Sequence, residues 1–129
     1  MKILGVDYGR RKVGLAVADG HLAEPLKVIR VNSLDEAAEK VAEAVEAEKV
    51  EKVIVGMSEG KMAEETRNFL STLVSRPSTV PVETFDETLT TQDAQKLAIE
   101  AGIKRLKRKA LEDAFAAAVM LQSYLDTHV

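Results

Sequence analysis

Residues 2–31, KILGVDYGRRKVGLAVADGHLAEPLKVIRV, carry the strongest indication of the chain's architecture. They contain three β-rich runs, at 2–8, at 13–18 and, after Pro25, at 26–31. The connections between these runs are short and polar, which favours an antiparallel meander of three strands. We therefore expect one side of the sheet to be antiparallel.

The pattern after this meander changes to alternating helices and strands. Ser33 and Glu36 are spaced as a helix-capping pair, and the alanine-rich segment behind them repeats with a helical period through about Lys49. The short apolar run 53–55 is typical of a parallel strand that is buried on both faces. The remaining pattern predicts a helix at about 63–75, a strand at 80–85, a helix that closes at Gly102 and a last helix at about 110–124.

The resulting order, βββαβαβαα, predicts an α/β fold with a five-stranded mixed sheet and helices on both of its faces. Functional sites in such sheets gather at the carboxyl ends of the parallel strands. A chain of 129 residues is of common domain size, so we expect residues 1–129 to form a single domain.

The composition excludes several kinds of site. The chain has no cysteine, which rules out a disulfide framework and a thiolate metal site. Any metal would be bound by oxygen or by the two histidines, His21 and His128, and the neighbours of neither histidine suggest a catalytic triad. No segment approaches the roughly 20 apolar residues that cross a bilayer, and the N-terminus lacks the features of a signal peptide. We expect a cytoplasmic protein.

Charge is segregated along the sequence. The net charge of −3 argues against a general nucleic-acid binder, but residues 36–51 hold much of the acidic excess. The run 103–109 is strongly basic and either binds phosphates or is a solvated loop whose charge is incidental. The expected substrate-binding cations belong to this run and to the segment after Asp7; they are Lys104, Arg105, Lys107, Arg108, Lys109, Arg10, Arg11 and Lys12.

Three acidic positions lie where a site would form. Asp7 ends the first strand, the pair Asp86-Glu87 ends the fifth, and Asp113 lies early in the last helix. Each has an ordinary explanation, as a turn acceptor for Asp7 and as favourable helix starts for the others. Together they suit a two-metal phosphodiesterase, in which several carboxylates bind Mg²⁺ or Mn²⁺ ions about 4 Å apart. The spacing leaves open whether Asp86 or Glu87 faces the metals.

The residues around these acids resemble a known family. The matching segments are Gly5–Gly9, Gly14–Asp19, Ile54–Met57, Asp86–Thr91 and Asp113–Ala117. In this order they are similar to the YqgF/RuvX family of ribonuclease H-like proteins, described as pre-16S rRNA nucleases and formerly as Holliday junction resolvases. The resemblance covers essentially the whole chain. It implies a ribonuclease H-like fold and a metal-dependent nuclease, with Asp7, Glu87 and Asp113 as the catalytic and metal-binding residues. Asp19 matches a recurrent acidic position, to which we assign a structural role.

Two departures from the family pattern bear on the substrate. Thr88 stands where the family usually has arginine, and threonine cannot bind a phosphate bidentately as a guanidinium does. The basic run 103–109 either compensates for this change or leaves a weaker grip on the substrate. Ser58 replaces a usual proline, which changes loop stiffness more than chemistry. Tyr8 and Phe85 are the only aromatic residues expected near the site, so we expect recognition of backbone and shape.

The favoured function is a metal-dependent endonuclease that matures the 5′ end of pre-16S rRNA, with structured RNA as its partner. A resolvase of branched DNA uses the same chemistry but should be a stable dimer. No apolar dimerisation stripe is obvious in this sequence, which favours a monomer or a weak homodimer. An ATP-binding phosphotransferase of the actin and sugar-kinase type would need two such domains. A non-catalytic nucleic-acid-binding module would have no need of all three carboxylates.

Overall fold

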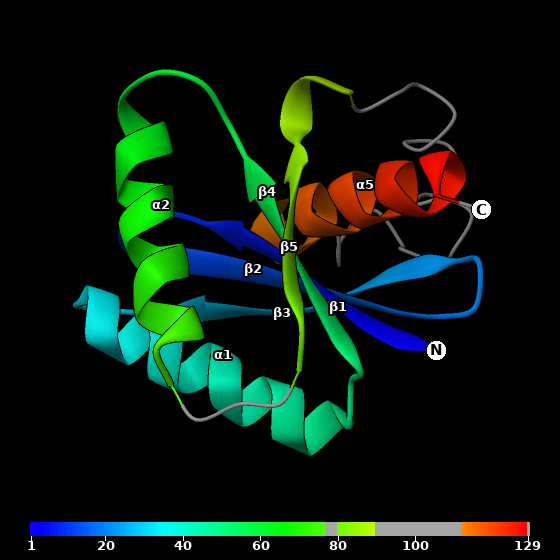
Figure 1. Ribbon diagram of the computed structural model, residues 1–129, viewed down its shortest axis with the longest axis horizontal. Helices are drawn as coiled ribbons and strands as arrows, with labels where there is room; N and C mark the ends of the chain where they lie inside the picture. Colours follow the sequence, from blue (N-terminus) through cyan, green and yellow to red (C-terminus); the bar gives the residue numbers. More distant parts are fainter. Residues whose placement is uncertain (77–79, 90–111, 129) are drawn as a thin grey trace.

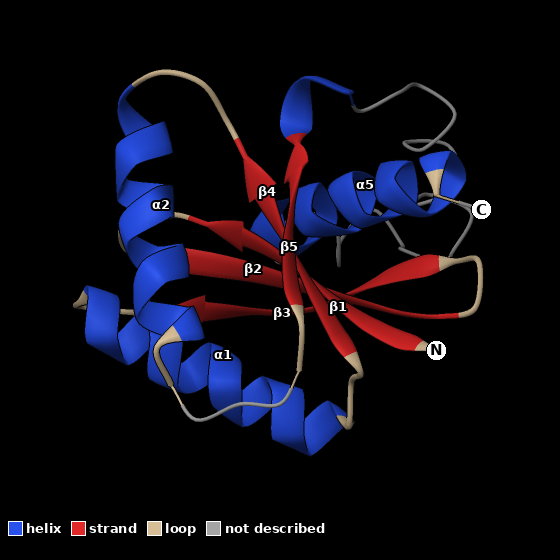
Figure 2. Ribbon diagram, in the orientation of Figure 1, coloured by secondary structure: helices blue, strands red, loops and turns tan. Residues whose placement is uncertain are grey.

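The computed structural model describes residues 1–76, 80–89 and 112–128. Within these residues, five strands form one sheet in the order β3-β2-β1-β4-β5 (Figure 2). The strands are β1 (Lys2–Tyr8), β2 (Lys12–Asp19), β3 (Ala23–Arg30), β4 (Lys52–Met57) and β5 (Val82–Asp86). β2 pairs antiparallel with β1 and β3, whereas β4 is parallel to both β1 and β5. The predicted five-stranded mixed sheet is confirmed.

Helices cover both faces of this sheet, as predicted (Figure 1). On one face lie α1 (Leu34–Glu48) and α2 (Lys61–Val74), and on the other lies α5 (Glu112–Thr127). A short 3₁₀ helix, η1 (Glu87–Leu89), follows β5 directly. The predicted helix that closes at Gly102 falls outside the described residues. None of the helices in the described ranges is both long and apolar enough to cross a membrane.

Successive residues of β1 point to opposite faces of the sheet and therefore enter two separate cores. Leu4 and Val6 are fully buried on the face that α1 and α2 cover. Gly5 faces α5, where a Cβ would stand 3.0 Å from the Cβ of Leu121 and 3.4 Å from the carbonyl oxygen of Ala117. The small residues of α5, Ala117 among them, let this helix lie close to the sheet.

The start of β3 differs more from its predicted position than the start of any other strand. β3 begins at Ala23 rather than after Pro25, so that the proline lies inside the strand. The prediction was wrong because β3 is at the edge of the sheet, where a residue without an N–H group is tolerated. The pairing of β2 with β3 also shifts register between Leu15 and Ala16, next to the pair Ala16–Pro25.

The capping pair at the start of α1 is confirmed, and it fixes where the chain leaves the meander. The Ser33 hydroxyl accepts a hydrogen bond from the Glu36 N–H at 3.1 Å, and the Glu36 carboxylate accepts one from the Asn32 N–H at 3.0 Å. The helix ends at Glu48, and Lys49 adopts a left-handed φ of 55°. The chain then enters β4, the strand that separates β1 from β5.

Candidate active site

Asp7 lies near the carboxyl end of β1, on the face of the sheet that α5 covers. It follows Gly5 by two residues, and residues two apart in a strand share a face. The side chain is half-buried. Its partner in β2 is Gly14, and continuing the register between β1 and β4 places Gly56 level with it on the other side. Asp7 therefore has a glycine beside it in each neighbouring strand.

Glu87 reaches the same face from the end of β5. A Cβ on Gly56 would stand 2.6 Å from Glu87 Oε1 and 3.2 Å from Cγ of Met120 in α5. The Glu87 carboxylate thus lies over β4, between the sheet and α5. Asp86, the last residue of β5, precedes Glu87 by one position, so its side chain is expected on the other face of the sheet. It is exposed. Of the two acids between which the sequence left the choice open, it is Glu87 that shares a face with Asp7.

Asp113 is the second residue of α5. Its backbone lies about one helical turn before Ala117, whose carbonyl oxygen is one of the atoms closest to Gly5. The helix that carries Asp113 therefore packs on the same face of the sheet as Asp7 and Glu87. The Asp113 side chain falls outside the described part of the chain, so its role as a ligand stays a prediction.

The acids at this edge of the sheet offer oxygen donors. In the described ranges, no three His, Asp or Glu side chains come together as a group that could hold a metal ion. His21 lies in the turn after β2, at the opposite end of the sheet, and His128 stacks on Tyr124 with ring centroids 4.1 Å apart. Both histidines are exposed. A set of carboxylate oxygens suits Mg²⁺ or Mn²⁺ better than a softer metal.

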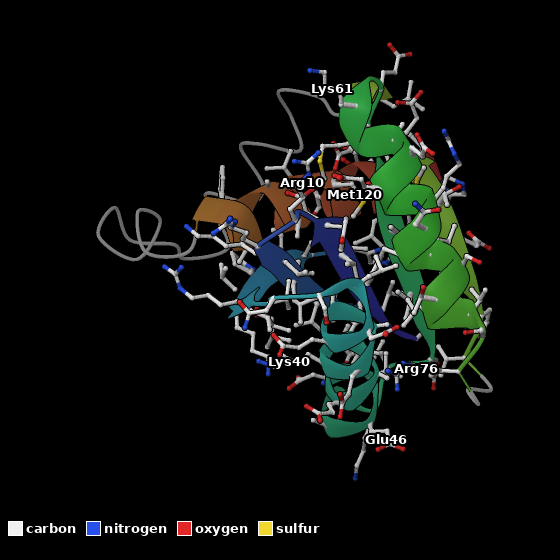
Figure 3. The ribbon with its side chains drawn as sticks, turned by 90° about the vertical axis from the view of Figure 1, so that its left-hand side faces the viewer. Arg10, Lys40, Glu46, Lys61, Arg76 and Met120 are labelled. Carbon is white, nitrogen blue, oxygen red and sulfur yellow. The ribbon has the colours of Figure 1, made fainter. Side chains whose placement is uncertain are left out.

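β1 is followed by three exposed cations, Arg10, Arg11 and Lys12. The Arg10 Nε donates a hydrogen bond to Glu65 Oε2 of α2 at 2.7 Å, and this bond raises the pKa of the guanidinium above its ordinary value. Figure 3 shows Arg10 and Met120 toward the same end of the molecule, away from Glu46 of α1. The other predicted cations, Lys104, Arg105, Lys107, Arg108 and Lys109, lie outside the described residues.

The two aromatic residues expected near the site both pack against other rings. Tyr8 stacks on Phe69 of α2 with ring centroids 4.5 Å apart and an interplanar angle of 17°. Burial raises the pKa of the Tyr8 hydroxyl, and the nearby Glu65 carboxylate raises it further. Phe85 is buried, with its ring edge to face against Tyr124 of α5. These packed positions are consistent with recognition of nucleic-acid backbone and shape.

Met120 and Glu65 complete this region, and nothing in the sequence marks either of them. Met120 is an ordinary core residue of an apolar helix, and Glu65 is one of two adjacent acids in α2. Each comes to the site through a contact between distant segments, such as the bond between Arg10 and Glu65 across 55 residues. Local periodicity carries no information about such contacts.

A mixed sheet of this order, with helices on both faces, is a ribonuclease H-like fold, and acids lie at the carboxyl ends of its strands β1 and β5. T. thermophilus RuvC in complex with a Holliday junction substrate matches it with a TM-score of 0.70 and 20% identity, over 98% of this chain and 96% of that one. The fowlpox virus resolvase in complex with Holliday junction DNA matches it with a TM-score of 0.63 and 16% identity, over 98% of each chain. These likenesses show the fold.

The family described as "RuvX: Holliday junction resolvase" matches residues 1–127, and the chain belongs to this family. A protein of Halothermothrix orenii named "Putative pre-16S rRNA nuclease" is 39% identical over 134 residues, covering 98% of this chain and 95% of the relative. A protein of Pelotomaculum thermopropionicum with the same name is 40% identical over 136 residues, covering 98% and 88%. The chain is a nuclease, an enzyme that hydrolyses phosphodiester bonds, and therefore it acts on nucleic acid.

Proposed function

We propose that this nuclease is a metal-dependent endonuclease in which Asp7, Glu87 and Asp113 bind Mg²⁺ or Mn²⁺. We propose further that it acts on structured RNA, in the maturation of the 5′ end of pre-16S rRNA. The observation that carries the first proposal is the position of the Glu87 carboxylate, which lies over β4 on the same face and at the same level as Asp7. The second is supported by the names of the relatives that cover nearly the whole chain.

The donor set fits a divalent cation. Asp7 and Glu87 supply oxygen ligands from strands on either side of β4, and Asp113 would supply another from the first turn of α5. Carboxylates gathered on one half-buried face repel one another and lose hydration, so a cation between them is favoured. Two such ions would activate a water molecule and stabilise the leaving oxygen of the phosphodiester.

The cations near these acids would bind the phosphates of the substrate. Arg10 is oriented by Glu65, and Arg11 and Lys12 follow it in exposed positions. The second group directly precedes Asp113 in the sequence and consists of Lys104, Arg105, Lys107, Arg108 and Lys109. Because binding through phosphates releases counterions, the affinity for RNA should fall steeply as salt rises.

Branched DNA is the second candidate substrate. The description of the family and the likeness to RuvC bound to a Holliday junction favour it. A resolvase acts on a two-fold symmetric junction and needs a stable dimer. We instead propose a cytoplasmic enzyme that is a monomer or a weak homodimer and in which residues 1–129 act as one domain.

The test is Mn²⁺-dependent cleavage of a transcript that carries the 5′ leader of pre-16S rRNA, beside a synthetic four-way DNA junction. Asp7→Asn, Glu87→Gln and Asp113→Asn should each lower kcat by about 100-fold or more, since each removes several kcal/mol of transition-state stabilisation. Asp86→Asn is the matched control, because it removes the same charge from the adjacent residue. Asp86 is exposed and belongs to the other face of the sheet from Glu87.

The wild type should cut the RNA, and the control variant should retain that activity. Symmetric cutting of the junction without cutting of the RNA would establish the resolvase in place of the RNA endonuclease. No cleavage of either substrate by the folded wild type would refute both, and so would full activity of Asp7→Asn.

A further inference from the structure

Asp7 lies in β1 and Glu87 directly follows β5, and these two strands are not neighbours. β4 lies between β1 and β5, and adjacent strands are about 4.8 Å apart, so the two backbones are separated by roughly 10 Å. A metal-binding role for both carboxylates requires one of them to extend across β4. The structure shows Glu87 making this crossing, at the level of Gly56.

Gly56 leaves the space through which Glu87 crosses. A Cβ at this position would stand 2.6 Å from Glu87 Oε1 and 3.1 Å from Glu87 Cγ, and the first of these distances is shorter than real Cβ contacts. From the other side, Cγ of Met120 lies 3.2 Å from the same point, and Met120 is almost fully buried in α5. Glu87 thus lies between the sheet and α5, and a side chain placed at residue 56 would push it out of this position.

The atoms that surround Gly56 differ in kind from those that surround Gly5. All three close atoms at Gly56 belong to long side chains, which can move without any change in the backbone. At Gly5 a Cβ would meet the Cβ of Leu121 and the carbonyl oxygen of Ala117, which are fixed by α5 itself. A methyl group at residue 56 should therefore displace Glu87 with little loss of stability, whereas a methyl group at residue 5 should loosen the packing of the helix on the sheet.

We propose that Gly56 is a positioning residue, because its lack of a side chain lets the Glu87 carboxylate lie over β4 beside Asp7. The proposal rests on the proposed role of Glu87 as a metal ligand. Asp7 also has Gly14 beside it in β2, so the sheet under the two carboxylates carries no side chain in either strand next to Asp7. The floor formed by Gly14 and Gly56 is the feature that makes room for a shared ion.

The experiment compares Gly56→Ala with Gly5→Ala in the full chain. For Gly56→Ala we expect an apparent Mn²⁺ affinity that is about 10-fold to 100-fold weaker, the usual effect of disturbing the support of a ligand. Its kcat should fall correspondingly, with the KM for RNA within about twofold of the wild type, since a positioning role acts on the chemical step. Direct Mn²⁺ binding, followed by the paramagnetic resonance of the free ion, gives a readout that does not depend on activity. Gly5→Ala should lower the midpoint of urea unfolding by more than Gly56→Ala does. A weaker Mn²⁺ affinity of Gly56→Ala at a nearly unchanged midpoint is then not a general effect of lost stability.

A double-mutant cycle with Glu87→Ala isolates the contact. Once Glu87 has lost its side chain, adding Gly56→Ala should change neither Mn²⁺ binding nor stability any further. If Gly56→Ala alone failed to fold, a folded double variant would show that the methyl group at residue 56 had overlapped with the Glu87 side chain. Normal Mn²⁺ binding by Gly56→Ala, together with weak binding by Glu87→Ala, would overturn the positioning role and leave the proposed function intact. Normal Mn²⁺ binding by Glu87→Ala would instead remove the ligand role on which both rest.

Discussion

Thr88 follows Glu87 directly, at the position where sequences of this kind usually carry arginine. A guanidinium at this point would bind a phosphate through two parallel hydrogen bonds, which a hydroxyl group cannot do. In the proposed site, phosphate binding would therefore rest on the cations that follow β1 and on those that precede Asp113. Arg10 is the described example, and its hydrogen bond to Glu65 fixes its direction.

Restoring the arginine should strengthen the binding of substrate. We expect Thr88→Arg to lower the KM for RNA several-fold. The plot of log(kcat/KM) against log(salt concentration) should become steeper by about one unit of slope, since one more phosphate is neutralised. The measurement is cleavage kinetics between low and physiological salt. Thr84→Arg is the matched control, because Thr84 is exposed in β5 and its side chain belongs to the other face of the sheet from Glu87. The salt slope of this variant should stay near that of the wild type. An equal effect of both substitutions would show that only net charge matters.

At the scale of elements, β4, β5 and α5 are joined by a polar network far from the carboxylates. Lys52 Nζ forms an ion pair with Glu83 at 2.7 Å and donates a hydrogen bond to the Tyr124 hydroxyl at 2.8 Å. That hydroxyl donates in turn to Glu83 at 3.0 Å, and His128 stacks on the ring of Tyr124. The network ties the C-terminal part of α5 to the strands whose carboxyl ends lie at the site.

This network makes stability depend on pH. The hydrogen bond from Lys52 lowers the pKa of the Glu83 carboxyl below its ordinary value of 4.5, and the bond to Glu83 raises the pKa of Lys52 above 10.5. A carboxyl with a lowered pKa stabilises the fold above its unfolded pKa, and this contribution is lost as the pH falls through the folded value. The contribution of Lys52 is present below 10.5 and is lost as the pH rises through its raised folded pKa.

The expected result is that Glu83→Gln flattens the acidic flank of the stability profile. Urea unfolding between pH 3 and pH 7 measures it, with the wild type losing more stability below about pH 4.5 than the variant does. Glu39→Gln, on the exposed side of α1, is the control and should follow the wild type. Parallel profiles for Glu83→Gln and the wild type would show that the ion pair contributes nothing to folding.

For the whole molecule, the three proposed ligands come from β1, from the end of β5 and from α5, so a bound metal would connect both ends of the chain. Binding to the folded state alone stabilises that state by mass action, by about 2.7 kcal/mol at a ligand concentration of 100 times Kd. We expect Mn²⁺ to raise Tm, and chelation of the ion to reverse the rise.

Thermal unfolding followed by circular dichroism at increasing Mn²⁺ concentration measures this effect without any substrate. The rise in Tm should be absent in Asp7→Asn and retained in Asp86→Asn, which carries the same change of net charge. A similar rise in both variants would indicate binding of the ion elsewhere on the surface and would contradict the proposed site.

The sequence by itself determined the order of elements, the mixed sheet and the start of α1, because hydrophobic period and capping chemistry act between residues that are near one another in the chain. It also placed Asp7 and the pair Asp86-Glu87 at the ends of strands, which the structure confirms. The ligand role of Asp113 stays a prediction. The start of β3 was missed, since the tolerance of Pro25 depends on the position of the strand at the edge of the sheet.

Only the tertiary structure decided which acid at the end of β5 shares a face with Asp7. The choice of Glu87 over Asp86 depends on the crossing above Gly56, where the absence of a side chain leaves room for the carboxylate between the sheet and Met120. It likewise decided that Glu65 orients Arg10. The physical reason is the same in both cases: these contacts join segments that the fold brings together, and no local pattern in the sequence records the distance between them.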